Sequence, residues 1–148
     1  MRTLWLLCLL AMPALGQWQL KGQGRFEYLF WDIYDARYYT GPEAQALSLH
    51  YLRDIKGQDI VKQTAKEWRH LGLYRQPWLD WFAEYCPDVK KGDTLRLEVT
   101  QSESRFYLNG ELLASNRDPD FGPAFLAIWL SPKTRAPELR LALLGKED

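Results

Sequence analysis

Hydrophobic and polar residues alternate through much of the N-terminal part of the chain, and this period predicts β-strands. Residues 18–30 read as extended, and Gly22 and Gly24 interrupt them as a tight hairpin or a β-bulge would. Residues 25–39 favour a strand because they are rich in aromatic and β-branched side chains. A further strand is predicted over residues 46–55.

The segment 25–39 carries apolar side chains at both alternating sets of positions. One set comprises Phe26, Tyr28, Phe30, Tyr34, Ala36 and Tyr38, and the other comprises Arg25, Leu29, Trp31, Ile33 and Arg37. A sheet with one face in water shows apolar side chains on one set only. We therefore expect this strand to be covered on both faces, at least over part of its length.

The period then changes to that of helices. Apolar residues recur at helical spacing over residues 58–71, and Gly72 suits the end of a helix there. A second helix is predicted to open at Pro77 and to stop at Pro87. The two helices follow the N-terminal strands directly.

Strands return over residues 94–100, 105–108 and 111–114. Asn109-Gly110 stands between the last two and is the strongest short signal for a hairpin. A helix is then predicted from Phe121, with Asp118 and Asp120 as candidate N-caps. Ser131-Pro132 ends that helix, and the last helix buries Leu139, Ala142, Leu143 and Leu144 before Gly145.

The order of elements is strands, two helices, strands, two helices. A doubly wound parallel sheet needs a helix between consecutive strands, so this order disfavours it. The pattern predicts an α+β fold, with an antiparallel sheet and helices packed on one face.

The first sixteen residues read as an export signal, and we leave them out of the fold. Met1-Arg2 is a short basic start, Leu4 to Leu15 is apolar, and Ala14-Leu15-Gly16 suits cleavage before Gln17. The predicted organisation is a signal peptide over residues 1–16 and one domain over residues 17–148, in the periplasm or secreted. A retained N-terminal anchor is the alternative.

Charge and cysteine content exclude several classes of protein. The chain has 19 Lys and Arg against 19 Asp and Glu, which predicts neither a nucleic-acid footprint nor a polybasic patch for anionic lipid. Cys86 alone remains after cleavage, so no intramolecular disulfide is expected. The chain has no Gly-x-Ser-x-Gly motif, and neither His50 nor His70 has a partner at metal-ligand spacing. We expect no metal and no cofactor.

Three arginines on aromatic strands point to an apolar pocket instead. Arg25, Arg37 and Arg53 lie among Tyr, Trp and Leu side chains, and a guanidinium in such surroundings needs an anionic partner. That partner is either an internal carboxylate or the acid group of a ligand. The internal candidates are Asp32, Asp35 and Asp54.

Several segments resemble, in order, those of the bacterial, signal-bearing chalcone isomerase-like proteins. The matching stretches are GQGRFEYLFWDIYDARYY, ALSLHYLRDI, VKKGDTLRLEV, FYLNGELLAS, DPDFGPAFLAIWLSPKT and LRLALLG, which together cover essentially the whole domain. The resemblance implies a curved antiparallel sheet that holds a layer of helices, with a ligand cleft between them. It also implies that Arg25 matches the family's early-strand arginine. Tyr34 stands roughly where the isomerases have a threonine.

The leading functional hypothesis is a non-catalytic binder of a small apolar acid, such as a fatty acid. The candidate ligand-binding residues are Arg25, Tyr34, Tyr38, Tyr51 and Arg53. The first alternative is an isomerase or intramolecular lyase on the same scaffold, which would need Arg25 and a tyrosine to converge on one oxyanion. The second is an envelope interaction protein that docks through exposed tryptophans between residues 68 and 81.

Overall fold

The structure, a computed structural model, describes residues 17–146 and consists of a six-stranded antiparallel sheet and four helices. Each strand pairs with its neighbour in the chain, so the order across the sheet is β1-β2-β3-β4-β5-β6. The strands are β1 (Gln19–Tyr28), β2 (Trp31–Gly41), β3 (Ala44–Tyr51), β4 (Thr94–Thr100), β5 (Ser104–Leu108) and β6 (Glu111–Asn116). The predicted export signal lies outside the described residues.

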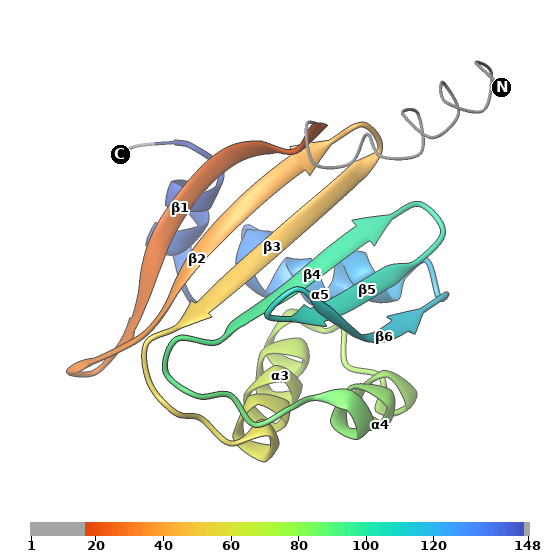
Figure 1. Ribbon diagram of the computed structural model, residues 1–148, viewed down its shortest axis with the longest axis horizontal. Coiled ribbons are helices and arrows are strands. Elements are labelled where there is room, and N and C mark those ends of the chain that lie inside the picture. The colour runs from red at the N-terminus through yellow and green to blue at the C-terminus, as the bar shows by residue number, and fades with distance from the viewer. Residues whose placement is uncertain (1–16, 147–148) are drawn as a thin grey trace, which may run out of the picture.

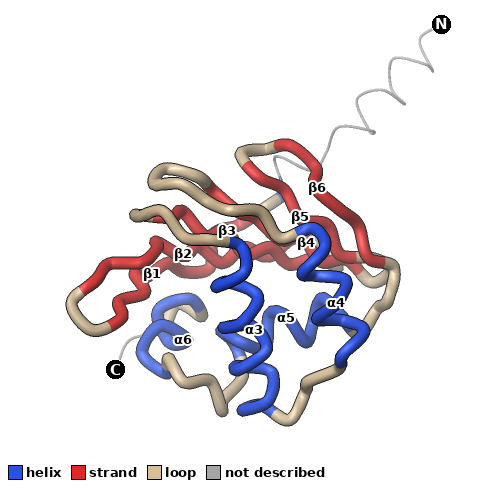
Figure 2. The backbone as a smooth tube through the Cα atoms, turned by 90° about the horizontal axis from the view of Figure 1, so that it is seen from below, coloured by secondary structure: helices blue, strands red, loops and turns tan. Residues whose placement is uncertain are grey.

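All four helices lie on the same side of the sheet (Figure 2). They are α3 (Gly57–Leu71), α4 (Gln76–Tyr85), α5 (Phe121–Leu130) and α6 (Pro137–Leu143). In Figure 1 the open face of the sheet is turned to the viewer, with α5 and α6 behind it. The α6 helix packs on β1 and β2, α5 packs on β4, and α3 contacts both α4 and α5. The predicted α+β fold with helices on one face is therefore confirmed.

An aromatic core joins the helices to the sheet. Trp68 of α3 is fully buried, and its indole nitrogen donates a hydrogen bond to the Ala124 carbonyl of α5 at 3.0 Å. Its ring centroid lies 5.8 Å from Trp78 and 5.9 Å from Phe121. Tilted and edge-on contacts of this kind suit the charge distribution of aromatic rings. Tryptophan and phenylalanine thus supply much of the packing between the helices and the sheet.

The segment 25–39 forms a hairpin, so the prediction of one continuous strand there is wrong. The chain reverses at Leu29 and Phe30, between β1 and β2, and Leu29 adopts a left-handed φ of 57°. Phe26 then pairs across the strands with Tyr34 on the helix side of the sheet, while Arg25 pairs with Asp35 on the open side. Coverage on both faces is also wrong, because Arg25 and Arg37 are exposed on the open side.

Gly22 and Gly24 allow α6 to approach β1 closely. A Cβ atom at Gly22 would lie 2.0 Å from the Ala142 carbonyl oxygen, and one at Gly24 would lie 2.8 Å from Leu139 Cδ1. The strand register shifts between Leu20 and Gly22, so the expected irregularity is a bulge and not a hairpin at this point. These glycines fix the spacing between the last helix and the first strand.

Of the two candidate N-caps, Asp120 takes the predicted position, but neither side chain forms a capping hydrogen bond to α5. Asp120 occupies the N-cap position of α5 without a side-chain hydrogen bond to the helix. The carboxylate of Asp118 instead accepts hydrogen bonds from the Trp78 indole nitrogen at 2.9 Å and from the Asp120 backbone N–H at 3.0 Å. Asp118 therefore links α4 to the turn before α5.

No helix in residues 17–146 has the length and apolarity needed to cross a membrane.

Candidate functional site

A cavity of about 410 Å³ lies between the helix side of the sheet and helices α3 and α5. Its walls are mainly apolar and draw on strands β1 to β4 and on α5. The apolar wall includes Phe26, Ile33, Leu49, Leu95, Phe125 and Ile128. Ligand pockets of about 300–1,000 Å³ with apolar walls and few polar groups are typical of sites for small molecules. The alternation of β2 and β3 creates this wall, because every second side chain faces the helices.

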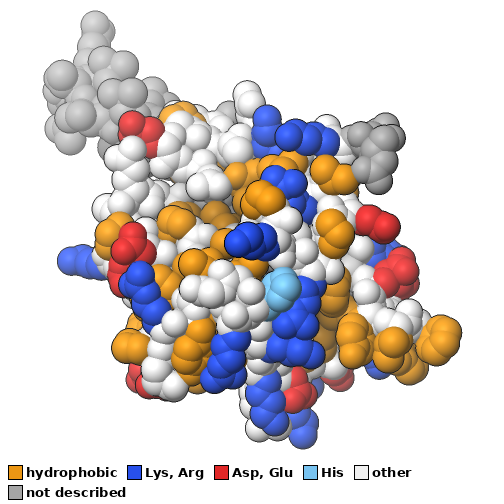
Figure 3. Space-filling model, turned by 180° about the vertical axis from the view of Figure 1, so that it is seen from behind, with side chains coloured by type: hydrophobic (Ala, Val, Ile, Leu, Met, Phe, Trp, Pro, Cys, Tyr) orange, Lys and Arg blue, Asp and Glu red, His pale blue; other side chains and the backbone are white. Residues whose placement is uncertain are grey.

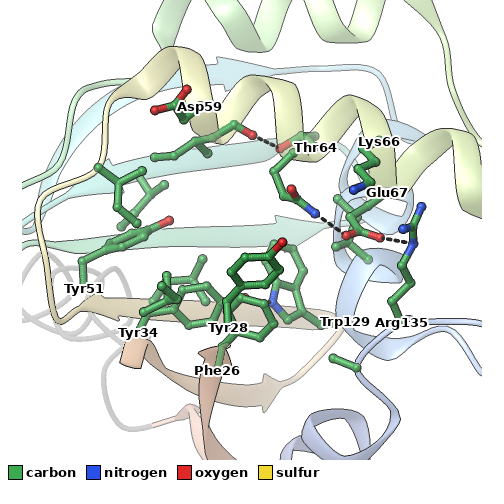
Figure 4. Close-up of a pocket in the computed structure, with 18 of the residues that line it drawn as sticks. Phe26, Tyr28, Tyr34, Tyr51, Asp59, Thr64, Lys66, Glu67, Trp129 and Arg135 are labelled. Atoms are coloured by element: carbon green, nitrogen blue, oxygen red, sulfur yellow. Dashed lines mark hydrogen bonds and ion pairs between the residues drawn. The ribbon is translucent and has the colours of Figure 1, made fainter. Parts of the chain in front are cut away.

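Tyrosines line one end of the cavity. The Tyr34 ring stacks on Phe26 at a centroid distance of 5.1 Å and meets Tyr51 edge-on at 5.6 Å. The Trp129 indole nitrogen donates a hydrogen bond to the Tyr34 hydroxyl oxygen at 2.8 Å. The Tyr51 hydroxyl points toward the cavity, and no hydrogen bond joins it to the other residues drawn there (Figure 4).

Both hydroxyls are held in the protonated form. Burial raises the pKa of Tyr34 and of Tyr51 far above the ordinary value of a tyrosine. The Tyr34 oxygen accepts a hydrogen bond from Trp129, so its own proton is free to be donated. The two hydroxyls therefore offer hydrogen-bond donors, and the carboxylate of Asp59 lies toward the same end of the cavity (Figure 4).

The other end of the cavity carries cations. Lys66 of α3 and Arg135 of the loop after α5 belong to the lining, and both are exposed at its edge. Arg135 Nε lies 3.2 Å from Glu67 Oε1, whereas Lys66 forms no ion pair within residues 17–146. Figure 4 shows Lys66, Glu67 and Arg135 together at the end opposite Tyr51. The cavity therefore combines mainly apolar walls with two cations, of Lys66 and Arg135, and three carboxylates, of Glu27, Asp59 and Glu67.

The structure brings two of the five predicted site residues to this cavity, Tyr34 and Tyr51. Arg25 does not line it. The Arg25 guanidinium donates hydrogen bonds to Asp35 at 2.8 and 3.2 Å and to Asp32 at 3.2 Å on the open side of the sheet. The hydrogen bonds from Arg25 hold the pKa of the Asp35 carboxyl below its ordinary value. Of the two partners proposed for this arginine, the structure shows the internal carboxylates.

Tyr38 and Arg53 also lie away from the cavity. Tyr38 is buried, and its hydroxyl donates to Gln45 Oε1 at 2.6 Å. The Arg53 guanidinium carbon lies 4.1 Å from the ring centroid of Trp31, so the cation stacks on an aromatic face near the β1–β2 turn. Ligand binding by any of the five residues stays a prediction.

Sequence reasoning missed Lys66 and Arg135, because it looked for a cation on the strands. A signal was present in α3, where Ile60, Gln63, Thr64 and Glu67 recur at helical spacing. These four residues all line the cavity. Polar side chains on a helix face that turns toward a core often mark a site.

The tryptophans between residues 68 and 81 do not form an exposed patch. Trp68 and Trp78 are buried in the core, and Trp81 is half-buried against Phe121 at a centroid distance of 5.1 Å. The hypothesis of a docking surface made by these tryptophans is therefore wrong. Amphipathic periodicity places such side chains against the core of a compact domain.

Neither the two histidines nor the cysteine of the described residues lines the cavity. His50 and His70 are exposed, 3.0 Å from Thr94 Oγ1 and 2.9 Å from the Lys133 carbonyl oxygen respectively. Burial raises the pKa of the Cys86 thiol to about 12, which keeps it in the unreactive form. Residues 17–146 contain no group of His, Cys, Asp or Glu side chains placed to hold a metal.

Comparison with known proteins gives one family and one fold. A family model described as chalcone isomerase-like matches residues 17–145. A crystal structure of a fatty-acid binding protein from Arabidopsis thaliana is similar to this chain, with a TM-score of 0.71 and 11% sequence identity. The alignment covers 87% of each chain, and at that identity it shows a shared fold alone. No curated protein matches the sequence.

Proposed function

Because the chain belongs to the chalcone isomerase-like family, we propose that it binds a small apolar acid, such as a fatty acid, without transforming it. The observation that carries this proposal is the cavity of about 410 Å³ with apolar walls and two cations at its mouth. The similar fold of a plant fatty-acid binding protein supports the same proposal. The predicted export signal supports a place of action in the periplasm or outside the cell.

Burial of the ligand's apolar body supplies the affinity. Each methylene group that leaves water for an apolar wall contributes about 0.8 kcal/mol. Part of this gain offsets the loss of translational and rotational freedom on association. The side chains of Leu49, Leu95, Phe125 and Ile128 present such a wall without a charged group among them.

The acid group of the ligand belongs at the mouth. A carboxylate placed deep among apolar side chains would lose its hydration without a cation to replace it. Lys66 is free to pair with it, and Arg135 can pair with it while retaining one contact to Glu67. The Tyr34 and Tyr51 hydroxyls at the opposite end can donate hydrogen bonds to a second oxygen, as an aromatic or hydroxylated acid would carry.

The isomerase alternative loses the arrangement on which it depended. It required Arg25 and a tyrosine to meet at one oxyanion. In the structure Arg25 faces Asp32 and Asp35 on the open side of the sheet, and Tyr34 faces the helices. Among the described residues, Arg25 therefore lies on the opposite side of the sheet from the Tyr34 hydroxyl. Ligand binding without catalysis is better supported than isomerisation.

The test compares dodecanoate with its methyl ester as competitors of a fluorescent fatty acid. We expect the wild-type protein to prefer the acid by about tenfold or more, since a hydrogen bond to a charged group contributes about 1.5–3 kcal/mol. The double variant Lys66→Gln/Arg135→Gln should bind both competitors with similar affinity. Because the apolar wall of this variant is intact, its affinity for the ester should equal that of the wild-type protein.

The matched control is Lys62→Gln/Arg69→Gln, which removes two charges from exposed positions of α3 that do not line the cavity. It should keep the preference for the acid. Equal affinity of the wild-type protein for acid and ester would contradict the cationic mouth. Failure of both competitors to displace the probe would contradict the proposed function as a whole.

A further inference from the structure

The tip of the β1–β2 hairpin exposes four apolar residues in a row. Tyr28, Leu29, Phe30 and Trp31 have 60, 76, 98 and 55% of their surface in water. The tip projects beyond the rest of the sheet in Figure 1. Single exposed apolar residues are normal on a protein surface. A contiguous set on a protruding turn indicates a site that binds a membrane or another protein.

The backbone at this tip is strained in order to carry an apolar residue. Leu29 adopts a φ of 57°, a conformation that glycine and asparagine accept far more readily than leucine. The β5–β6 hairpin of the same chain uses Asn109 and Gly110 at its positive-φ positions, and the β2–β3 turn places the polar Glu43 at a φ of 54°. The tip thus retains leucine where residues better suited to the turn exist, which points to a role for its side chain.

Cations gather beside the tip on the helix side of the molecule. They are Lys62, Lys66 and Arg69 of α3 with Lys133 and Arg135 of the loop after α5, and all are exposed. The His70 ring, 2.9 Å from the Lys133 carbonyl oxygen, holds the two segments together. Figure 3 shows a column of Lys and Arg side chains on this face and a hydrophobic lobe at the neighbouring edge. We call this set of five the basic column.

An even charge balance over the whole chain does not exclude a local excess of cations on one face. On the sheet, arginines pair with carboxylates within 3.2 Å, as Arg25, Arg96 and Arg105 do. In the basic column only Arg135 has an ion pair among the described residues, with Glu67. The cavity lining itself carries three carboxylates, of Glu27, Asp59 and Glu67, and two cations, of Lys66 and Arg135. The excess of cations on this face comes from Lys62, Arg69 and Lys133, which are exposed outside the lining.

Tip and basic column flank the same opening. Tyr28 lines the cavity from the hairpin, and Lys66 and Arg135 line it from the helix side. A plane that touched both would cover the mouth. Tyrosine and tryptophan prefer the boundary between water and lipid, and Lys and Arg side chains are attracted to anionic lipid headgroups.

We propose that this face docks on an anionic lipid bilayer, with the tip in the interfacial region and the basic column on lipid phosphates. The mouth of the cavity then opens against the membrane, and an apolar acid passes between bilayer and cavity without crossing water. The docking follows from the surface alone. The exchange of ligand rests on the proposed function.

The experiment measures co-sedimentation with vesicles of mixed phosphatidylcholine and phosphatidylglycerol, and with vesicles of phosphatidylcholine alone. The protein is purified after expression of the full sequence, and mass spectrometry determines at which residue the purified chain begins. We expect the wild-type protein to bind the anionic vesicles more tightly and to lose this preference at high salt. Leu29→Asn/Phe30→Ser and, separately, Lys62→Gln/Lys133→Gln should each weaken binding by about tenfold or more.

Two controls change the same chemistry elsewhere. Leu112→Ser removes an exposed leucine from β6, at the other edge of the sheet, and Lys21→Gln/Arg117→Gln removes two exposed charges away from the mouth. Both should bind vesicles like the wild-type protein. None of these substitutions touches the cavity lining, so all variants should bind dodecanoate in solution, which also reports that they are folded.

The outcomes separate the two proposals. Binding of dodecanoate with no binding to anionic vesicles overturns the docking and leaves the proposed function standing. Vesicle binding that depends on the tip, without dodecanoate binding, supports the docking and overturns the proposed function. Equal vesicle binding by the wild-type protein and the tip variant also overturns the docking.

Discussion

At the scale of single residues, Tyr34 and Tyr51 differ by one hydrogen bond, although both are buried in the same cavity wall. Trp129 donates to the Tyr34 hydroxyl at 2.8 Å, whereas no hydrogen bond joins the Tyr51 hydroxyl to the residues drawn around the cavity (Figure 4). Tyr34→Phe should therefore lower the free energy of unfolding by about 1–3 kcal/mol, because the buried Trp129 N–H loses its acceptor. Tyr51→Phe should change it little.

Urea unfolding followed by fluorescence measures both variants under the same conditions. Tyr51→Phe is the matched control, since it removes the same atom from the neighbouring strand. Similar losses of stability in the two variants would show that the hydrogen bond to Trp129 does not stabilise the fold. Both variants keep the apolar wall and the cationic mouth, so both should still bind dodecanoate.

The same scale shows why the partner of Arg25 could not be read from the sequence. Asp32, Asp35 and Asp54 were all candidate partners of a strand arginine, and the carboxylate of a ligand was the alternative. The choice depends on register, which places Arg25 directly opposite Asp35. Register depends on the turn, and Leu29-Phe30 carries none of the residues that usually signal a hairpin.

At the scale of elements, the contact between β1 and α6 depends on Gly22. A methyl group there would lie 2.0 Å from the Ala142 carbonyl oxygen, which belongs to helix backbone and cannot move alone. Gly22→Ala should lower the free energy of unfolding by about 1–3 kcal/mol or more, as overpacking does elsewhere. Chemical denaturation with the fluorescence of the core tryptophans as signal measures this loss.

Gly41→Ala is the control for that substitution. Its Cβ atom would meet the Trp18 ring at 3.4 Å, an ordinary contact distance, and its φ is not left-handed. We expect this variant to be as stable as the wild-type protein within about 1 kcal/mol. If Gly22→Ala were equally stable, α6 would not be held against β1 by the contact described.

Helices and short strands were predictable because their periodicity is local. The predicted helix over 58–71 corresponds to α3, and the prediction from Pro77 to Pro87 corresponds to α4. The Asn109-Gly110 turn was also found where its dipeptide indicates it. The region 25–39 failed for the opposite reason. The aromatic residues at the tip of this hairpin are exposed, but in the sequence they have the same pattern as the buried side chains of a central strand. Alternation of apolar and polar residues does not distinguish these two cases.

At the scale of the whole molecule, the fold class followed from the order of elements, and the cavity did not. Its walls bring together Tyr34, Lys66 and Ile128, which are far apart in the chain and belong to three different elements. Composition also hid the charge separation, because equal numbers of acids and bases say nothing about where each lies. The cavity and the separation of charges both form only when the helices pack on one face of the sheet.

The proposed function depends on the claim that the cavity takes up an apolar acid, and native mass spectrometry with dodecanoate detects such a complex without a competing probe. Ile128 lies on the cavity wall, so Ile128→Trp should fill part of the space of about 410 Å³, whereas Ile128→Val leaves it open. We predict one bound dodecanoate in the wild-type protein and in Ile128→Val. Ile128→Trp, with an unchanged circular dichroism spectrum, should bind none. Equal binding by Ile128→Trp, or no binding by the wild-type protein, would contradict the claim.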